Sequence, residues 1–386
     1  MMRLAVLGAS GCIGARIVER LHLCRRAEIR PVVRNPARLA GPARFALDGR
    51  VADGLDRAAL AAAMAGCDAV VHAIAGDRRT ILGTAEAAYR AAQDAGVKRM
   101  IYLSSASVHG QAPPPGTDER SPLRRRQPVA YNRHKIDAES LLRRLRSSGS
   151  VELVILRPGI VYGPRSSWIG GFADELLSGK AYLVEGGAGI CNALYVDNLV
   201  HAVELALRAP GIDREAFLLG DEETVTWRDL YRPIAEALGV SVDRIPSLRY
   251  APRFDWKAWR RSALRLLPKP VGAAARAVYS AARSRRPDQE PSHGASRGGP
   301  VPSLERALLH RCRVKLPWDK ARERLGYAPI VSFAEGCRRS VAWLEFADYP
   351  VVTTAGPDHR RAFLDPAADK IAAQAVSASS AAIRRS

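Results

Sequence analysis

The stretch Leu4-Ala-Val-Leu-Gly8-Ala-Ser10-Gly11-Cys12-Ile13-Gly14 decides the fold of this chain. A short apolar run, typical of a buried strand, ends at Gly8, and a segment with helical apolar spacing follows the glycines. Gly8 permits a tight turn, Gly11 lets a pyrophosphate approach backbone N–H groups, and Gly14 allows the helix to pack closely on the strand. A plain strand-to-helix turn is the alternative, but the position between a strand and a helix favours dinucleotide binding.

The same alternation continues through the first half of the chain. Apolar runs rich in β-formers lie at residues 4–7, 29–33, 69–74, 100–103 and 153–156. Segments with helical spacing separate them, at 13–23, 60–64, 82–95 and 138–145. Strands that alternate with helices predict a parallel sheet covered on both faces. We therefore expect an α/β fold, with a Rossmann-type doubly wound parallel sheet in residues 1–164.

The chain changes character after Pro164. Helical spacing dominates at 168–177, 198–207 and 227–238, with short strands expected at 181–184 and 216–219. We expect a smaller, mostly helical C-terminal substrate lobe over 165–346, while segments near 190–220 complete the first domain. Residues 287–302 have the Pro, Gly and Ser content of a linker, and the Ala/Ser-rich residues 351–386 are expected to be a disordered tail.

Composition excludes several classes of protein. The 386 residues carry 59 Lys and Arg against 39 Asp and Glu, a net charge of +20, with 47% hydrophobic and 6% aromatic residues. No nucleic-acid-binding signature accompanies the positive charge, so we expect no nucleic-acid partner. The six cysteines form no CxxC pair, which argues against a disulfide scaffold or zinc site and suits a cytoplasmic protein. No apolar run is long enough to span a membrane.

Half of the net charge lies in one amphipathic segment. Residues 249–286 contain eleven Arg or Lys residues and one Asp, with aromatic residues among them. Such a segment is suited to peripheral contact with an anionic membrane. Its apolar face could instead pack on the core as a lid of the substrate lobe, and both interpretations stay open.

The end of the second expected strand bears on the choice of nucleotide. NAD-binding sites carry an acidic residue there, whereas this strand ends in Arg34, with Arg38 nearby. A guanidinium suits a 2′-phosphate, so NADP is favoured and NAD is the alternative. Arg34 could also be an ordinary solvated arginine.

Tyr131 and Lys135 begin another helical run. Residues four apart share a helix face, so the phenol and the ammonium project into one site, where the cation would lower the pKa of the tyrosine. Ser105 follows the strand at 100–103, and sites in open α/β sheets lie beyond the carboxyl ends of strands. Ser105 could therefore hydrogen-bond the oxygen that Tyr131 protonates, although a serine in this position is also a common helix or turn cap.

These features together resemble the extended short-chain dehydrogenase/reductase family, which includes NAD-dependent epimerases and dehydratases and the 3β-hydroxysteroid dehydrogenases. The resemblance covers about residues 3–345 and is weakest over 245–315. The matching segments are the glycine loop, Gly49–Asp56, Val70–Ala75, Ser105 with Tyr131 and Lys135, Arg157–Pro164, Ala193–Leu199 and Leu316–Leu344.

The resemblance implies a hydride-transfer enzyme that acts on a small-molecule substrate. Ser105, Tyr131 and Lys135 would be catalytic: Tyr131 as acid/base on a secondary alcohol or ketone, Lys135 as its partner and as a ligand of the nicotinamide ribose, and Ser105 as the residue that orients the substrate oxygen. The implied cofactor-binding residues are Gly8, Ser10, Gly11, Cys12, Ile13, Gly14, Arg34, Asp53, Ala73, Ala75, Tyr131, Lys135, Pro158 and Ile160. No metal is implied. Family members often dimerise through two helices, which would lie here near 80–95 and 131–147.

Departures from the family pattern narrow the reaction. Dehydratases carry an Asp-Glu pair after the catalytic hydroxyl, where this chain has Ala106 and Ser107, so sugar 4,6-dehydration is disfavoured. Ile160 replaces the Asn that meets the sugar nucleotide in nucleotide-sugar enzymes. His109 stands where tyrosine is common, as a catalytic residue or a plain loop residue. Arg165 could meet a diphosphate or be a surface arginine.

Three functions stay open at this point. The first is a nucleotide-sugar epimerase or reductase, which is commonest in the family and is slightly favoured. The second is a reductase or dehydrogenase of a steroid-like or lipid-like alcohol, which Ile160 favours. The third is an NADP-binding regulator without catalysis, and the presence of both Tyr131 and Lys135 argues against it.

Overall fold

The structure is a computed structural model, and it describes residues 1–249, 300 and 302–352. The expectations for the basic segment 249–286, the linker 287–302 and the tail 351–386 fall almost entirely outside the described residues.

Seven parallel strands form the central sheet, in the order β11-β6-β5-β4-β1-β2-β3. Their bounds are β1 Arg3–Leu7, β2 Glu28–Val33, β3 Arg50–Val51, β4 Ala69–His72, β5 Arg99–Leu103, β6 Glu152–Pro158 and β11 Ala216–Leu219. The chain starts in the middle of the sheet, builds one edge and then crosses back to β4 to build the other. The strand order therefore reverses between β1 and β4, where doubly wound sheets bind their ligands. The predicted Rossmann-type sheet is confirmed.

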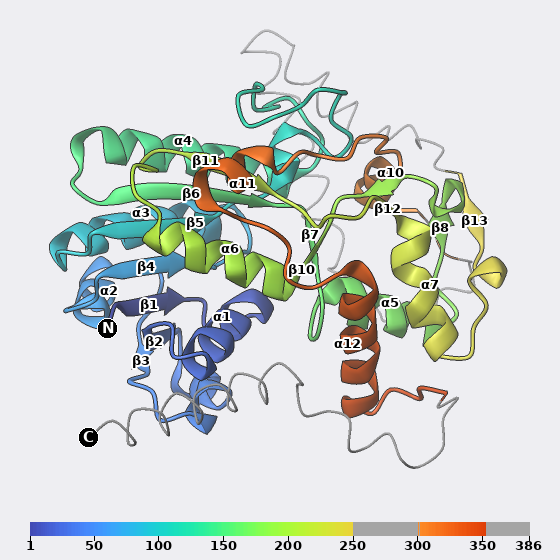
Figure 1. The fold of residues 1–386 in the computed structure, drawn as a ribbon, viewed down its shortest axis with the longest axis horizontal. Coiled ribbons are helices and arrows are strands. Elements are labelled where there is room, and N and C mark those ends of the chain that lie inside the picture. The colour runs from blue at the N-terminus through green and yellow to red at the C-terminus, as the bar shows by residue number, and fades with distance from the viewer. Residues whose placement is uncertain (250–299, 301, 353–386) are drawn as a thin grey trace, which may run out of the picture.

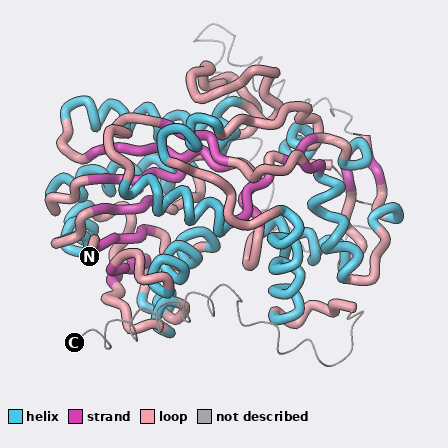
Figure 2. Tube along the Cα trace, in the orientation of Figure 1, coloured by secondary structure: helices cyan, strands magenta, loops and turns pink. Residues whose placement is uncertain are grey.

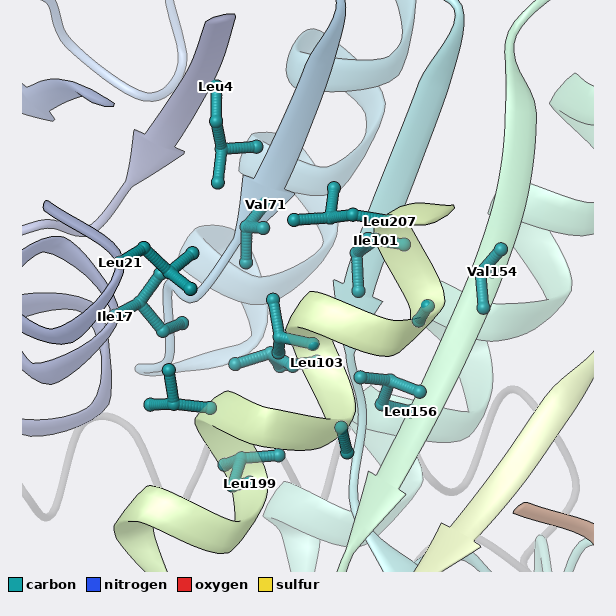
Figure 3. Close-up of a cluster of buried hydrophobic side chains, with 14 of the residues drawn as sticks. Leu4, Ile17, Leu21, Val71, Ile101, Leu103, Val154, Leu156, Leu199 and Leu207 are labelled. Carbon is teal, nitrogen blue, oxygen red and sulfur yellow. The ribbon is translucent and has the colours of Figure 1, made fainter. Parts of the chain in front are cut away.

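Helices cover both faces of this sheet (Figure 1). One face carries α1 (Cys12–Leu23), α6 (Val196–Arg208) and α11 (Asp319–Leu325); the other carries α2 (Arg57–Met64), α3 (Arg78–Asp94) and α4 (Ala130–Ser148). Alternate side chains of a strand enter opposite layers, so Leu4 joins the α1–α6 layer and Ala5 joins the α2–α4 layer. Figure 3 shows the first layer, in which Ile17 and Leu199 face Val71, Ile101 and neighbouring strand residues.

Beyond the sheet, a second and mostly helical part packs around its own apolar core (Figure 1, Figure 2). Its helices are α5 (Ser167–Leu177), α7 (Trp227–Ala237), α10 (Leu304–Leu309) and α12 (Phe333–Phe346). Three two-stranded pairs accompany them: β7 (Ile160–Tyr162) with β10 (Ala193–Tyr195), β9 (Ile190–Cys191) with β12 (Val225–Thr226), and β8 (Leu183–Val184) with β13 (Ser247–Leu248). The 3₁₀ turns are η1 (Pro36–Leu39), η2 (Pro42–Arg44), η3 (Ala106–His109), η4 (Glu185–Gly187) and η5 (Val242–Arg244).

Some helices begin earlier than the apolar spacing indicated. The helix expected over 82–95 starts at Arg78, because the Asp77 carboxylate accepts a hydrogen bond from the Thr80 backbone N–H and caps the helix. Asp56 caps α2 in the same way, through Ala59 N–H. Hydrophobic periodicity marks the buried face of a helix and misses the polar first turn that a cap supplies.

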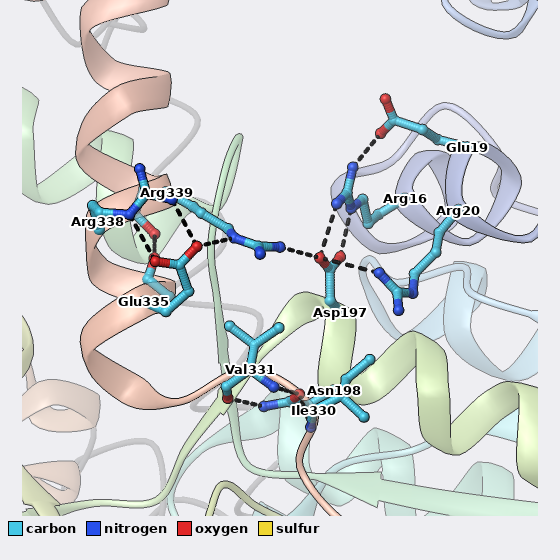
Figure 4. Close-up of polar contacts among 12 residues, drawn as sticks. Arg16, Glu19, Arg20, Asp197, Asn198, Ile330, Val331, Glu335, Arg338 and Arg339 are labelled. Atoms are coloured by element: carbon cyan, nitrogen blue, oxygen red, sulfur yellow. Dashed lines mark hydrogen bonds and ion pairs between the residues drawn. The ribbon is translucent and has the colours of Figure 1, made fainter. Parts of the chain in front are cut away.

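A buried carboxylate ties the two parts of the molecule together (Figure 4). Asp197, at the start of α6, has no exposed side-chain surface and accepts hydrogen bonds from Arg16 of α1, at 2.5 Å and 2.8 Å. Arg20 of α1 lies 3.6 Å from the same carboxylate, and Arg339 of α12 lies 3.4 Å from it. The sheet layer and the C-terminal helix therefore share one negative charge.

We predict that Asp197→Asn lowers the free energy of unfolding by about 1–3 kcal/mol, because hydrogen bonds to charged groups are the stronger kind. Urea unfolding of the purified variant measures this change. The matched control is Asp319→Asn, whose exposed pair with Arg322 should contribute less than about 0.5 kcal/mol. Equal stability of the two variants would contradict a tie through Asp197.

Candidate active site

The glycine loop is shaped so that side chains do not fit at two of its positions. Gly8 follows β1 with φ +83°, and a Cβ there would lie 2.9 Å from the Ala73 carbonyl oxygen. A Cβ on Gly14 would lie 2.2 Å from the Gly8 carbonyl oxygen. The loop is thus held tightly between β1, the end of β4 and the first turn of α1.

The N-terminus of α1 is open to an anion. Its N-cap is Gly11, which offers no side-chain cap, and the first turn contains no acidic residue. The first backbone N–H groups of a helix lack partners within the helix, so they point toward whatever binds at this loop. The Cys12 thiol donates to the Pro164 carbonyl at 3.5 Å, and burial raises its pKa. A pyrophosphate therefore fits this end of the helix.

A basic pocket adjoins the loop. It is lined by Ser10 from the loop and by Arg38, Arg44 and Arg165. Arg44 pairs with Glu19 at 2.8 Å. Arg34 is exposed just past β2 and does not line this pocket. A nucleotide that carries a phosphate on its adenosine ribose fits such a set of guanidinium groups.

Other residues that the resemblance implied for the cofactor lie around the same edge of the sheet. The Asp53 carboxylate is exposed and accepts from Leu55 N–H. Ala73 and Ala75 follow β4, where the Ala73 N–H donates to the Leu7 carbonyl and holds the strand end against the glycine loop. Pro158 ends β6 and Ile160 begins β7.

The Ser, Tyr and Lys residues meet at the carboxyl end of β5. Tyr131 and Lys135 lie in the first turns of α4, and Ser105 is the second residue after the end of β5. The Lys135 ammonium is buried and donates to the Leu103 carbonyl at 2.7 Å, two residues before Ser105. It also lies 5.8 Å from the centroid of the Tyr131 ring.

Burial dominates the acid–base properties of this pair. Burial raises the pKa of Tyr131 to about 12, and the charge of Glu305 adds to the effect. Burial lowers the pKa of Lys135 to about 8, against an opposing contribution from Glu139. The sequence led us to expect that Lys135 lowers the tyrosine pKa. The structure differs because Lys135 directs its hydrogen bonds to β5 and not to the phenol oxygen.

Ser105 belongs to a hydrogen-bonded network that the sequence did not reveal. Its hydroxyl oxygen accepts a hydrogen bond from Ser107 N–H and so caps η3, which is the turn-cap role that the sequence also allowed. The same oxygen lies 2.8 Å from the Ser107 hydroxyl oxygen. Ser107 donates to Asn132 of α4 at 2.8 Å, and the Asn132 amide donates to Gln127 at 2.8 Å. Gln127 completes a ring by donating to the Ser107 carbonyl at 3.3 Å.

A buried ion pair supports the catalytic helix and was also missed. Arg157 of β6 binds the Glu139 carboxylate of α4 with two hydrogen bonds, of 3.0 Å and 2.7 Å. His109 is buried against Arg157, at 3.1 Å, and burial lowers its pKa to about 4. His109 thus has a structural contact, away from the pocket described next. The sequence indicated only that Glu139 shares a helix face with Lys135, one turn before it, and not that it pairs with Arg157.

A mostly apolar pocket opens beside Ser105 and Ser107. Its wall consists of Ser105, Ala106, Ser107, Gly110, Gln111, Pro113, Pro158, Gly159, Ile160, Ile190, Asn192, Trp227, Leu309, Cys312 and Leu316. Tyr131 is not among the lining residues, and the residue after it, Asn132, accepts a hydrogen bond from Ser107 of the wall. The walls from β9, α7 and α10 were not foreseen, since they come from distant parts of the chain.

Two absences concern the described residues. Among residues 1–249 and 302–352, no group of three or more His, Cys, Asp or Glu residues is arranged to hold a metal ion. In the same part of the chain, no helix combines the length and apolar character needed to cross a membrane.

The chain is similar in sequence to several proteins of known activity. The chain is 28% identical over 353 residues to a 4-hydroxy-2-methyl-3-oxo-4-farnesyl-3,4-dihydroquinoline-1-oxide ketoreductase of Stigmatella aurantiaca, covering 87% of this chain and 94% of the relative. It is 29% identical over 300 residues to a 3β-hydroxysteroid dehydrogenase/Δ5→4-isomerase of Mycobacterium tuberculosis, covering 70% and 78%.

Solved structures share the fold. A dTDP-glucose 4,6-dehydratase of Streptomyces venezuelae with NAD bound superposes with a TM-score of 0.66 at 23% identity, covering 89% of this chain and 97% of that one. A UDP-glucose 4-epimerase of Thermotoga maritima with UDP-glucose gives 0.61 at 20% identity, covering 90% and 99%. Residues 4–220 match the model of the NAD dependent epimerase/dehydratase family. The chain belongs to this family of nicotinamide-nucleotide enzymes.

Proposed function

We propose that the protein is an NADP-dependent reductase or dehydrogenase that transfers hydride at a ketone or secondary alcohol of an uncharged, largely apolar substrate. The observation that carries the proposal is the meeting of Ser105, Tyr131 and Lys135 at the carboxyl end of β5, beside an apolar pocket.

The residues present fit a nicotinamide dinucleotide. The N–H groups of the glycine loop and of α1 would hold the pyrophosphate, and Lys135 would hold the nicotinamide ribose. The nucleotide, when bound, supplies or accepts the hydride. Tyr131 would give a proton to the ketone oxygen, and Ser105 would donate a hydrogen bond to the same oxygen. With a pKa of about 12 the phenol is protonated at neutral pH, which suits ketone reduction.

The pocket wall favours the apolar substrate over a nucleotide sugar. None of the described residues that line the pocket is charged, although 59 residues of the chain are Lys or Arg. A nucleoside diphosphate needs cations or many donors for its phosphates. Trp227, Leu309 and Ile160 offer an apolar surface instead. The sequence favoured the sugar slightly, and the pocket supports the second interpretation.

The ketoreductase and steroid dehydrogenase relatives support the same choice, since their names describe a ketone that carries a farnesyl group and an alcohol of a steroid. Ala106 and Ser107 provide no carboxylate for dehydration. The reaction proposed therefore needs no acid or base beyond Tyr131.

Replacing Tyr131 with Phe tests the proposal. We expect kcat for NADPH-dependent reduction of cyclic ketones to fall about 10²- to 10⁴-fold, the usual contribution of a general acid. NADPH binding should persist, and fluorescence titration would measure it. The control, Tyr349→Phe, removes a phenol that bonds only Asp174 on the far lobe. Unchanged turnover in Tyr131→Phe would remove Tyr131 from the mechanism, and absence of turnover in the wild type would favour the regulator.

The basic pocket predicts the nucleotide. We expect Arg38→Ala combined with Arg44→Ala to raise KM for NADPH roughly ten- to hundredfold, because two of the cations that line the pocket are lost, and to leave KM for NADH almost unchanged. Arg50→Ala is the control, since this exposed arginine pairs with Asp48. An equal effect on both nucleotides would show that these arginines do not read the phosphate.

We predict that the reduction slows at pH values above the pKa of Lys135. Its pKa is lowered to about 8 by burial, so it is cationic below that pH and loses its proton above it. If the ammonium is required, kcat/KM should decline as the pH rises through about 8. Lys135→Arg should remove this decline at a lower overall rate, because a guanidinium stays protonated. Initial rates from pH 6 to 10 measure the profile, and a wild-type rate that is flat up to pH 10 would contradict the assignment.

A further inference from the structure

The ring of Ser107, Asn132 and Gln127 determines where the hydroxyl hydrogens of the site point. The Gln127 group that faces the Ser107 carbonyl must be its NH₂, since two facing carbonyl oxygens would repel. Its oxygen therefore faces Asn132 and accepts from the Asn132 NH₂. The Asn132 oxygen then faces Ser107 and accepts its hydroxyl hydrogen. The orientation of both side-chain amides therefore follows from the single contact between Gln127 and the Ser107 carbonyl.

The direction extends to Ser105. A serine hydroxyl has one hydrogen, and Ser107 gives its hydrogen to Asn132. The 2.8 Å contact between the two hydroxyls must then be a bond from Ser105 to Ser107. Asn132 has no exposed surface and Gln127 is almost fully buried, so solvent does not compete for these bonds. Ser107 is left as an acceptor toward the pocket that both serines line.

When a substrate ketone binds, only the hydrogen bond from Ser105 to Ser107 has to change. The Ser105 hydrogen turns to the ketone oxygen, and one lone pair of Ser107 becomes free beside it. This lone pair can accept a hydrogen bond, while the Ser107 hydrogen stays committed to Asn132. A substrate group next to the carbonyl thus meets an acceptor in a wall that otherwise offers mostly apolar surface.

We propose that the site takes α-hydroxy ketones, or in the reverse direction vicinal diols, with Ser107 as the residue that recognises the neighbouring hydroxyl. The spacing of the two serine oxygens, 2.8 Å, suits the two adjacent oxygens of such a substrate. This inference rests on the proposed function and names its substrate class. Asn132 and Gln127 act through Ser107 and are positioning residues.

The reaction balances without a further reactant. The carbonyl carbon receives hydride from the reduced nicotinamide nucleotide, and its oxygen receives the proton of Tyr131. The C=O π bond breaks, C–H and O–H bonds form, the nucleotide is oxidised and the ketone is reduced to a vicinal diol. The phenol regains its proton from solvent, and the neighbouring hydroxyl keeps its own.

The test compares 2-hydroxycyclohexanone, 2-methoxycyclohexanone and cyclohexanone with NADPH and, in parallel, NADH. The methoxy compound withdraws electrons much as the hydroxy compound does but has no hydrogen to donate. We expect the wild type to use the hydroxy ketone with a kcat/KM roughly five- to tenfold above the methoxy ketone, the worth of one ordinary hydrogen bond. Ser107→Ala should abolish this preference, so that the hydroxy and methoxy ketones are used with equal kcat/KM.

Two controls separate recognition from damage. Ser107→Thr keeps a hydroxyl and should keep the preference, and Ser147→Ala removes an exposed serine hydroxyl that bonds only within α4 and should change nothing. Equal use of the hydroxy and methoxy ketones by the wild type, or a preference that survives in Ser107→Ala, would overturn this inference and leave the proposed function standing. Absence of turnover with all three ketones and both nucleotides would overturn the proposed function, and the inference with it.

Discussion

The buried pair of Glu139 and Arg157 sets the position of α4, the helix that carries Tyr131 and Lys135. Glu139 has no exposed surface, and its carboxylate takes two hydrogen bonds from Arg157 and a third, of 2.5 Å, from Ser104. An unpaired charge in the core costs several kcal/mol, so α4 cannot slide along the sheet without breaking these contacts. Lys135 lies one turn before Glu139, and Ser104 is the neighbour of Ser105. One ion pair thus determines the geometry of Tyr131, Lys135 and Ser105 together.

The fold was predictable because its signals are local. The run from Leu4 to Gly14 contains a buried strand, a turn that needs glycine and the start of a helix within eleven residues. Each strand of a parallel sheet is buried on both faces, so it stands out as a continuous apolar run. The same logic placed Ser105 at the end of β5. The predicted starts of α2 and α3 were too late, because these helices begin at Arg57 and Arg78. The residues that cap them, Asp56 and Asp77, stand directly before these starts in the sequence.

The substrate pocket was not predictable in this way. Trp227, Leu309 and Leu316 form part of its wall, although they are separated by up to 89 positions in the chain and each fits an ordinary core pattern. Gln127 precedes α4 in a loop, and nothing in its neighbours shows that its side chain closes a ring with Ser107 and Asn132. Polar contacts of this kind depend on tertiary geometry. The sequence indicated only that Ser107 is not a carboxylate, whereas its ring with Asn132 and Gln127 supports our inference that its oxygen can accept a hydrogen bond.

The two ends of the candidate site impose opposite electrostatic conditions, with the proposed catalytic residues between them. Arg38, Arg44 and Arg165 gather where phosphate charge would bind, while the described wall of the substrate pocket carries no charge. Burial between these ends favours neutral forms, which raises the pKa of Tyr131 and lowers that of Lys135. A phenol that keeps its proton is a donor for a ketone oxygen. Under the proposed function, low polarity around the pair would favour apolar ligands and would also keep Tyr131 protonated as the acid for ketone reduction.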